Sequence, residues 1–409
     1  MTRKHVVVVG AGFAGLTAGF DLYNSGFEVT VLEALSRVGG RVWSAELSNG
    51  AVAELGGEWI WSEDTALIQL AERLDLSLVK VGVDFRIRKV INGPAVSSDQ
   101  QKEVHRTAFN ALRALDPTVV SNLTVGEFLD RVPISAPQRL LLSSRLRSSY
   151  GTDLYKIALR MLGDYSLGSI SEYFRLAQGN QSLADELEAR LPDVRLGHMV
   201  TRINHHDTGV IVYGRAENEF EIIADAVVAA LPVKLLAKLP FEPPLPPLID
   251  KAISTVSMGA AAKLTVGVRN RPRLFAVQDV EMSYWCWTGN GESGQARSAV
   301  TAFCGSKLAQ KNLNTESRDP STWISKLKSS LLDVDFINDP IMVDWSQEEL
   351  AGGCYSAFDN ASTDMIPHLS QPVGRLFFAG EHTDEDSGTM QGAVASGLRA
   401  AKQVGEVFL

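Results

Sequence analysis

Residues 6–15 read VVVVGAGFAG, and this stretch decides the fold. The four valines are typical of a strand buried on both faces, as in a parallel sheet. Three glycines follow with G-x-G-x-x-G spacing: Gly10 permits a tight turn, Gly12 lets the backbone approach a pyrophosphate, and Gly15 lets a helix pack on the strand. The helix is expected over residues 16–24. The segment therefore predicts a dinucleotide-binding strand–turn–helix unit.

The next segment of the chain supports this prediction. A second strand, residues 27–32, is expected to lie parallel to the first, because a helix joins the two. The strand ends at Glu33, which follows Gly12 by 21 residues. A carboxylate at this position accepts hydrogen bonds from both ribose hydroxyls and repels a 2′-phosphate, so NADP is disfavoured. The glycine pattern itself fits either NAD or FAD.

Composition limits the classes of protein to consider. With 409 residues the chain exceeds the usual size of one hydrophobic core, which predicts two domains. Its 45% hydrophobic and 21% charged residues are ordinary for a soluble globular protein. A net charge of −9 argues against a nucleic-acid partner. We interpret Arg139, Arg145 and Arg147 as the exposed face of a helix.

Three cysteines, Cys286, Cys304 and Cys354, have no metal-ligand spacing, so neither a metal site nor a disulfide framework is expected. Sparse cysteines fit a reducing cytoplasm. No apolar run reaches the ~18 residues that a membrane span needs, so we expect no membrane anchor.

The pattern along the chain predicts two domains that are discontinuous in sequence. Residues 64–191 have mostly helical periodicity, and β character returns afterwards in a hairpin near residues 199–214 and a buried strand at 225–231. A proline-rich connector, FEPPLPPL at 241–248, precedes further strands. We expect one domain to comprise residues 1–82, 193–240 and 350–409, and the other to comprise residues 83–192 and 241–349.

Further motifs carry a resemblance to a known family. Glu33 is followed by RVGGR at 37–41 and LGGEWIW at 55–61, which together resemble the FAD-binding segment of the flavin-containing amine oxidases. That family includes monoamine oxidases, polyamine oxidases and L-amino-acid oxidases. The resemblance implies an α/β fold: a Rossmann-type, GR2-like FAD-binding domain with a parallel central sheet, and a second α+β substrate-binding domain. It implies that Arg41 binds the pyrophosphate and that Gly56, Gly57 and Trp59 lie at the flavin.

The end of the chain resembles the closing FAD motif of the same family. FFAGEHT at 377–383 would bring Gly380 and Glu381 to the polar chain of the cofactor. MQGAVASGLRAA at 390–401 would bring Gln391 and Ala393 to the isoalloxazine. Val200 stands where the family has a residue beside the adenine, although it would equally suit a strand core.

The segment MGAAAKLTVGV, 258–268, resembles the family strand whose lysine holds a water near flavin N5. This implies a catalytic role for Lys263. A lysine at this place in an apolar strand is either at the strand end, reaching solvent, or buried and functional. The resemblance favours the second alternative.

DWSQEELAGGCYSAF, 344–358, resembles the segment that carries the flavin-linked thiol of monoamine oxidases. Cys354 is therefore a candidate for a covalent thioether to FAD, or else a small buried thiol packed against the ring. Trp345 would pack near the isoalloxazine or in the core. Tyr355 would orient the amine nitrogen at the active side of the flavin. Monoamine oxidases have a second aromatic residue where this chain has Thr389, so this chain has only one of the two aromatic residues that form the cage around the amine.

The reaction that the resemblance implies is hydride transfer from the amine α-carbon to flavin N5, followed by imine hydrolysis and reoxidation by O2 to hydrogen peroxide. Alternatives on the same scaffold are a desaturase, a protoporphyrinogen-oxidase-like enzyme, or a non-catalytic flavin-binding protein. The expected partners are then a small-molecule amine and O2. The sequence leaves open whether the protein forms a homodimer, which amine it oxidises, and which acceptor reoxidises the flavin in the cell. YWCW at 284–287 either lines the substrate cavity or forms aromatic core.

Overall fold

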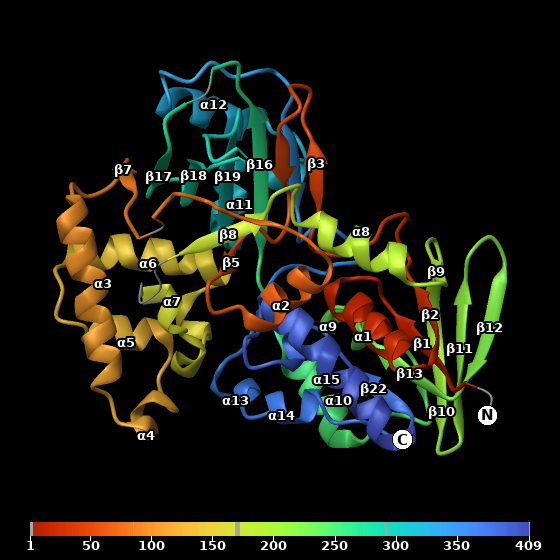
Figure 1. Cartoon of the computed structure of the whole chain (residues 1–409). Helices are drawn as coiled ribbons and strands as arrows, with labels where there is room; N and C mark the ends of the chain where they lie inside the picture. The colour runs from red at the N-terminus through yellow and green to blue at the C-terminus, as the bar shows by residue number, and fades with distance from the viewer. Residues whose placement is uncertain (1–2, 85, 168–171, 271, 292, 409) are drawn as a thin grey trace.

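The computed structural model describes residues 3–408, except residues 85, 168–171, 271 and 292. Its first layer is a five-stranded sheet with strand order β22-β13-β1-β2-β9. All of its pairs are parallel. The strands are β1 (His5–Val9), β2 (Glu28–Leu32), β9 (Val194–Arg195), β13 (Ala226–Ala229) and β22 (Leu376–Phe378). The predicted parallel pair of the first two strands is confirmed, and the strands come from both ends of the chain (Figure 1).

The alternation of side chains in β1 explains how the sheet is covered. Val6 and Val8 belong to a core shared with α1 (Phe13–Asn24), α8 (Gln181–Arg190) and α15 (Met390–Phe408). Val7 and Val9 belong to a second core on the opposite face. All four valines are nearly inaccessible, as a strand between two layers requires.

The second face of the parallel sheet packs against a small sheet and a helix. The small sheet has the order β12-β11-β10-β14, with the predicted hairpin formed by β10 (Met199–His206) and β11 (Gly209–Arg215). Its other strands are β12 (Glu219–Ala224) and β14 (Phe241–Glu242). The helix is α10 (Pro247–Thr255), so the proline-rich connector contains a strand residue pair and the start of a helix.

The upper part of Figure 1 is a six-stranded sheet with the order β20-β16-β19-β18-β17-β7. Its strands are β7 (Lys89–Ile91), β16 (Ala261–Gly267), β17 (Phe275–Asp279), β18 (Tyr284–Thr288), β19 (Ala299–Gly305) and β20 (Ile341–Asp344). Two helices, α11 (Lys307–Leu313) and α12 (Ser321–Ser330), contribute Leu313 and Trp323 to the core behind this sheet. The combination of a parallel α/β layer and this antiparallel-rich part confirms the predicted fold class.

A helical part lies beside the six-stranded sheet (Figure 1). It consists of α3 (Ser98–Arg113), α4 (Pro117–Val120), α5 (Val125–Arg131), α6 (Ala136–Tyr150) and α7 (Asp164–Leu167). Three of these helices, α3, α5 and α6, begin with capping boxes at Ser97, Thr124 and Ser135, which satisfy the first free N–H groups of each helix.

The prediction of a mostly helical stretch over 64–191 missed three short strands, β6 (Leu78–Lys80), β7 and β8 (Tyr173–Leu176). They are only three or four residues long, too short to show an alternating pattern. β6 and β8 form a small sheet with β5 (Ile60–Trp61). The remaining elements are β3 (Ser44–Glu46), β4 (Val52–Glu54), α2 (Thr65–Arg73), α9 (Val233–Leu236), β15 (Ser257–Met258), β21 (Ser356–Ala357), α13 (Asn360–Thr363) and α14 (Ile366–Leu369).

Leu183, Ala184 and Leu187 of α8 lie in the core of the parallel sheet, although the sequence division put them in the substrate-binding segment. The division of the chain into domains stays a prediction. In the described part of the chain, no helix has the length and apolarity to cross a bilayer.

Candidate functional site

A cavity of about 800 Å³ lies at the carboxyl ends of the parallel strands. We name it the long cavity. It is lined by the β1–α1 turn, the end of β2, the segments 37–42 and 347–355, and the start of α15. In open α/β sheets this edge is where ligands bind, because loops and helix N-termini converge there.

The glycines at the start of α1 serve two different purposes. A Cβ at Gly15 would lie 1.9 Å from the carbonyl oxygen of Gly10, so only glycine lets the helix approach the turn. A Cβ at Gly12 would meet no protein atom within 4 Å, and Gly12 lines the long cavity. Gly12 therefore keeps space open on the cavity side, whereas Gly15 serves packing and does not line either cavity.

Glu33 fixes the turn and faces the same cavity. Its Oε2 accepts a hydrogen bond from the backbone N–H of Ala11 at 2.7 Å, and its Oε1 accepts one from that of Leu35 at 2.9 Å. Each carboxylate oxygen retains a lone pair for a further donor. Glu33 can therefore hold both the protein backbone and a ligand hydroxyl.

Arg41 and Glu381 join the two ends of the chain across the long cavity. The Nη1 of Arg41 donates to Oε1 of Glu381 at 2.9 Å. Glu381 also accepts from Ser356 and from the backbone N–H of Gly388 at 2.7 Å. Burial raises the pKa of the Glu381 carboxyl, but Arg41 and His382 more than offset this and hold the pKa below its ordinary value. Glu381 is therefore an anion fixed beside Arg41.

Most of the predicted cofactor residues line the long cavity: Gly10, Gly12, Glu33, Arg41, Gly56, Gly57, Val200, Trp345, Cys354, Gly380, Glu381 and Ala393. Trp345 donates its indole N–H to the carbonyl of Leu55 at 2.9 Å, and burial raises the pKa of the Cys354 thiol to about 12. The structure places Gln391 elsewhere: its Oε1 accepts from the backbone N–H of Leu67, which ties α15 to α2.

A second cavity, of about 370 Å³, adjoins the first, and we name it the short cavity. It lies between β5, β18, α6 and the loop before α15. Eight residues line both cavities and form their common wall: Gly56, Gly57, Lys263, Phe303, Tyr355, Gly388, Thr389 and Met390. The three predicted catalytic residues, Lys263, Tyr355 and Thr389, all belong to this wall.

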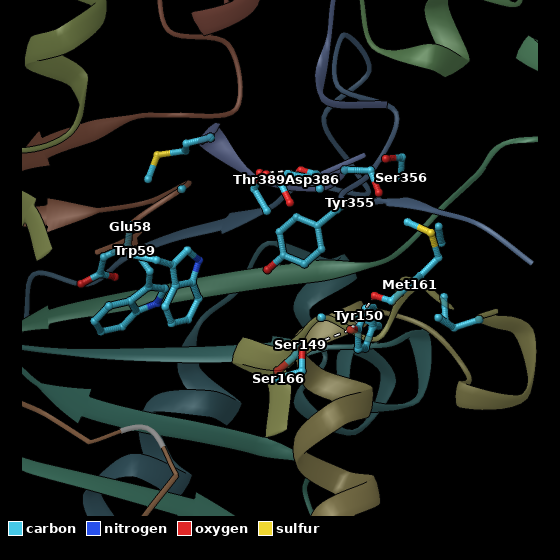
Figure 2. Close-up of a pocket in the computed structure, with 18 of the residues that line it drawn as sticks. Glu58, Trp59, Ser149, Tyr150, Met161, Ser166, Tyr355, Ser356, Asp386 and Thr389 are labelled. Atoms are coloured by element: carbon cyan, nitrogen blue, oxygen red, sulfur yellow. Dashed lines mark hydrogen bonds between the residues drawn. The ribbon is translucent and has the colours of Figure 1, made fainter. Parts of the chain in front are cut away.

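Aromatic side chains form much of the short cavity. Trp59 lies 6.2 Å from Trp285 and 5.3 Å from Trp287, measured between ring centroids, and these two tryptophans of β18 stack at 4.0 Å. Trp59, predicted at the cofactor, thus lines the short cavity rather than the long one. Figure 2 shows the Tyr355 ring projecting into the space between Trp59 and Tyr150.

Thr389 uses its side chain to start α15. Its hydroxyl donates to the carbonyl of Asp386 at 2.5 Å and accepts from the backbone N–H of Gly392 at 2.9 Å. It lies close to Tyr355 on the cavity wall (Figure 2). Burial raises the pKa of the Tyr355 phenol above its ordinary value, so the ring is neutral at physiological pH. The peptide bond between Cys354 and Tyr355 is cis.

Lys263 is buried, at 4% exposure, which excludes the alternative that it reaches solvent. Its Nζ donates to the carbonyl of Gly56 and to Oε2 of Glu58, both at 2.8 Å. The other oxygen of Glu58 accepts from Arg297 at 2.9 Å. Burial raises the pKa of the Glu58 carboxyl, but Lys263 and Arg297 outweigh this and lower it overall. Glu58 thus binds two buried cations at the junction of the cavities.

Sequence reasoning missed several residues of the short cavity. Glu58 stood within the quoted LGGEWIW motif, but its partner Arg297 is 239 residues away, and no local pattern joins them. The interpretation of Arg145 as part of an exposed helix face is wrong, since Arg145 is 7% exposed and lines the short cavity. At 3.6 residues per turn Arg145 lies about a third of a turn away from Arg139, which does reach solvent.

The two cavities together suit a ligand pair. The long cavity extends from Glu33 to the common wall, and this wall separates it from the aromatic short cavity. No group of three or more His, Cys, Asp or Glu side chains with metal-binding geometry occurs in the described residues.

Comparisons with known proteins agree with this arrangement. The family model described as flavin containing amine oxidoreductase matches residues 13–156 and 135–405. Amine oxidase [flavin-containing] B of Mus musculus is 24% identical to this chain, covering 98% of it and 86% of the mouse protein. Amine oxidase [flavin-containing] of Danio rerio is also 24% identical, and the match covers 98% of this chain and 85% of the Danio rerio protein.

Solved structures share the fold over nearly the whole chain. A putrescine oxidase redesigned in its cofactor binding superposes with a TM-score of 0.83 at 21% identity, with 99% of each chain covered. Cyclohexylamine oxidase from Brevibacterium oxydans gives a TM-score of 0.80 at 20% identity, again with 99% of each chain covered. The architecture built around the two cavities is thus shared with amine oxidases of solved structure.

Proposed function

This chain belongs to the family of flavin-containing amine oxidoreductases, and from that premise we propose that it holds FAD in the long cavity and oxidises a small amine in the short cavity. The observation that carries the proposal is the common wall of the two cavities, where Lys263, Tyr355 and Thr389 meet. A flavin ring at this wall would face an amine in the aromatic chamber.

The residues of the long cavity fit FAD. A Cβ added at Gly12 would find no protein atom within 4 Å, and this open space suits a pyrophosphate at the N-terminus of α1. Glu33 suits the ribose hydroxyls, Val200 the adenine, and Arg41 the pyrophosphate. Gly56 and Gly57 line the part of the long cavity where the flavin edge would lie. A Cβ at Gly56 would lie 2.0 Å from the carbonyl oxygen of Arg41, so this glycine lets the segment pack against residue 41.

When bound, the flavin would accept a hydride from the carbon next to the amine nitrogen and pass the electrons to O2, giving hydrogen peroxide and an imine that water hydrolyses to an aldehyde or ketone. Lys263 has one ammonium N–H left after its bonds to Gly56 and Glu58, and this donor would hold a water at the ring. The face of Tyr355 would position the amine nitrogen by a polar contact with the aromatic ring.

Anaerobic mixing with amines tests the proposed function. We expect the purified yellow protein to lose its absorbance near 450 nm with at least one primary or secondary amine, and to release one peroxide per amine once air enters. The alternatives on this scaffold predict otherwise: a non-catalytic flavoprotein keeps its colour with every amine, and a desaturase is bleached only by substrates without an amine. Bleaching by no amine would overturn the proposal.

We further propose that Cys354 links to FAD through a thioether. The sulfur would replace one hydrogen of the flavin 8α-methyl group, the two electrons and the displaced hydrogens would pass to the flavin, and O2 would reoxidise it. Its thiol lines the inner part of the long cavity beside Tyr355. Acid precipitation of the wild-type protein is expected to leave almost all of the flavin colour in the pellet, whereas Cys354→Ala is expected to release it into the supernatant. Cys304→Ala is the matched control, because Cys304 is buried in β19 and lines neither cavity. A wild-type protein that gives up its flavin to acid would show a non-covalent site.

A further inference from the structure

We propose that the substrate amine also carries a carboxylate, and that Arg145 binds this carboxylate in the short cavity. The inference deepens the proposed function and rests on it. It names the class of substrate as amino acids, in the broad sense of molecules with both an amine and a carboxylate.

The environment of Arg145 is unusual for a buried arginine. Its side chain extends from α6 to the wall of the short cavity and is 7% exposed. Nη1 contacts the ring of His105, and Nε has no hydrogen-bond partner. Among the described residues, no Asp or Glu oxygen lies within 4 Å of the guanidinium nitrogens of Arg145. The described residues therefore give this buried cation no ion-pair partner, and the Asp84 carboxylate acts on it only from beyond 4 Å.

The groups around Arg145 strengthen its positive field. Arg88 also lines the short cavity, with its guanidinium 3.8 Å from the ring centroid of Trp285. Asp84 is engaged by Arg86, whose Nε and Nη2 donate to its two oxygens at 2.9 and 3.0 Å. Burial, followed by Arg145 and Arg88, holds the pKa of His105 well below its ordinary value, so its ring stays neutral. The Asp84 carboxylate is thus already held by Arg86 and reaches Arg145 only at longer range.

Such an arrangement costs stability unless a ligand completes it. A buried charge without a partner costs several kcal/mol, and arginine cannot escape this by losing its proton. Burial lowers the pKa of Arg145 to about 10, which still leaves the guanidinium charged at neutral pH. A guanidinium pairs most strongly with a planar, two-oxygen anion, and a carboxylate is the smallest organic group of that kind.

The other cations of the short cavity have contacts of their own, and Arg88 packs its guanidinium on the ring of Trp285. Lys263 is paired with Glu58, and Arg160 is paired with Asp364 at 2.6 Å. Glu385 and Asp386 also line the cavity, and they are exposed, as expected at its mouth. A zwitterion therefore meets carboxylates as it enters and a cation on the cavity wall. The tryptophans Trp59, Trp285 and Trp287 then suit an apolar substrate side chain.

Matched pairs of amines test the inference: phenylalanine and 2-phenylethylamine, tryptophan and tryptamine, 4-aminobutanoate and butylamine. Anaerobic flavin reduction is followed by stopped flow for each. We expect the wild-type protein to bind the acidic member of at least one pair roughly 10-fold or more tightly than the amine without the carboxylate. Arg145→Met should weaken that binding by roughly 30-fold or more, because it removes one partner of a desolvated ion pair. The affinity for the decarboxylated amine should change by less than about 3-fold.

Direct binding gives a second readout that needs no turnover. Calorimetric titration with 3-phenylpropanoate is expected to show binding to the wild-type protein and much weaker binding to Arg145→Met. Binding to Arg145→Lys should be intermediate, because lysine keeps the positive charge but loses the two parallel N–H donors of the guanidinium. Arg139→Met is the matched control, since Arg139 lies on the same helix, is paired with Asp130 and faces solvent. Without ligand, Arg145→Met should melt no lower than the wild type, because it removes an unpaired buried charge.

The outcomes separate the inference from the function on which it rests. If decarboxylated amines bleach the flavin as well as or better than every acidic partner, the inference is overturned and the amine oxidase remains. It is also overturned if the preference for acidic members survives in Arg145→Met, or if it is undiminished in Arg145→Lys should the methionine variant not fold. If no amine of either kind bleaches the flavin, the proposed function fails, and the inference fails with it.

Discussion

Gly12→Ala is expected to yield a folded but colourless protein, whereas Gly15→Ala is expected to lose stability whether or not FAD is present. The added methyl at residue 12 meets no protein atom within 4 Å, and the φ of −73° suits any residue, so the chain itself tolerates it. The methyl instead enters the space proposed for the pyrophosphate. We expect FAD affinity to fall by roughly 30-fold or more, about 2 kcal/mol.

The alanine at residue 15 acts on the polypeptide alone. Its methyl would lie 1.9 Å from the carbonyl oxygen of Gly10, an overlap with backbone that requires the helix to move away from the strand. We expect a loss of about 3 kcal/mol or more in the free energy of unfolding. Melting temperature and flavin content measured on both variants check the pair of expectations. A Gly12→Ala protein with full flavin content would contradict the proposed position of the pyrophosphate.

Glu58→Gln is expected to be the most destabilising single change at the junction of the cavities. It leaves Lys263 and Arg297 buried without their common anion, and breaking a buried ion pair from one side costs about 3–5 kcal/mol. Chemical denaturation at neutral pH measures the loss. Glu54→Gln is the matched control. Burial and then Glu58 raise the pKa of Glu54, and its contact with Arg175 is long, at 4.0 Å, so a neutral amide should cost only about 1–2 kcal/mol.

The pH dependence of Glu58→Gln has a definite sign. Because the pKa of Glu58 is held below its ordinary value of 4.5, its stabilising contribution is complete above that pH and is lost as the pH falls through the lowered pKa. The difference in unfolding free energy between wild type and variant should therefore be constant near neutrality and narrow below about pH 4.5. An equal difference at pH 3 and pH 7 would show that Glu58 is not ionised in the folded protein.

The dinucleotide half of the site could be predicted from sequence because its chemistry is local. Gly10, Gly12, Gly15 and Glu33 lie on one strand–turn–helix–strand unit, so spacing alone predicts that they meet at one edge of the sheet. The second half could not be predicted in the same way. Arg145 lies on α6, Glu58 follows β4, and Arg297 precedes β19. Only tertiary packing brings Arg145 and Glu58 to the short cavity and Arg297 to Glu58.

Helical periodicity also proved ambiguous for α6. The helix is covered on several sides, and buried positions include polar as well as apolar residues, among them Ser144, Arg145 and Ser148. No apolar stripe therefore marks its inner face. Gln391 shows the opposite error, since its position in a motif suggested a cofactor contact while its side chain holds the backbone of α2. A motif gives the place of a backbone segment more reliably than the direction of each side chain.

The sheet order β22-β13-β1-β2-β9 has a consequence for synthesis of the protein on the ribosome. Its strands β1 and β2 emerge early, whereas β22 and the following Glu381 emerge much later, because Glu381 follows its ion-pair partner Arg41 by 340 residues. The nascent polypeptide therefore has an unfinished sheet edge until β22 has left the ribosome. The cavity that we propose for FAD is complete only after Glu381 has emerged, so loading of the cofactor would follow synthesis of this segment.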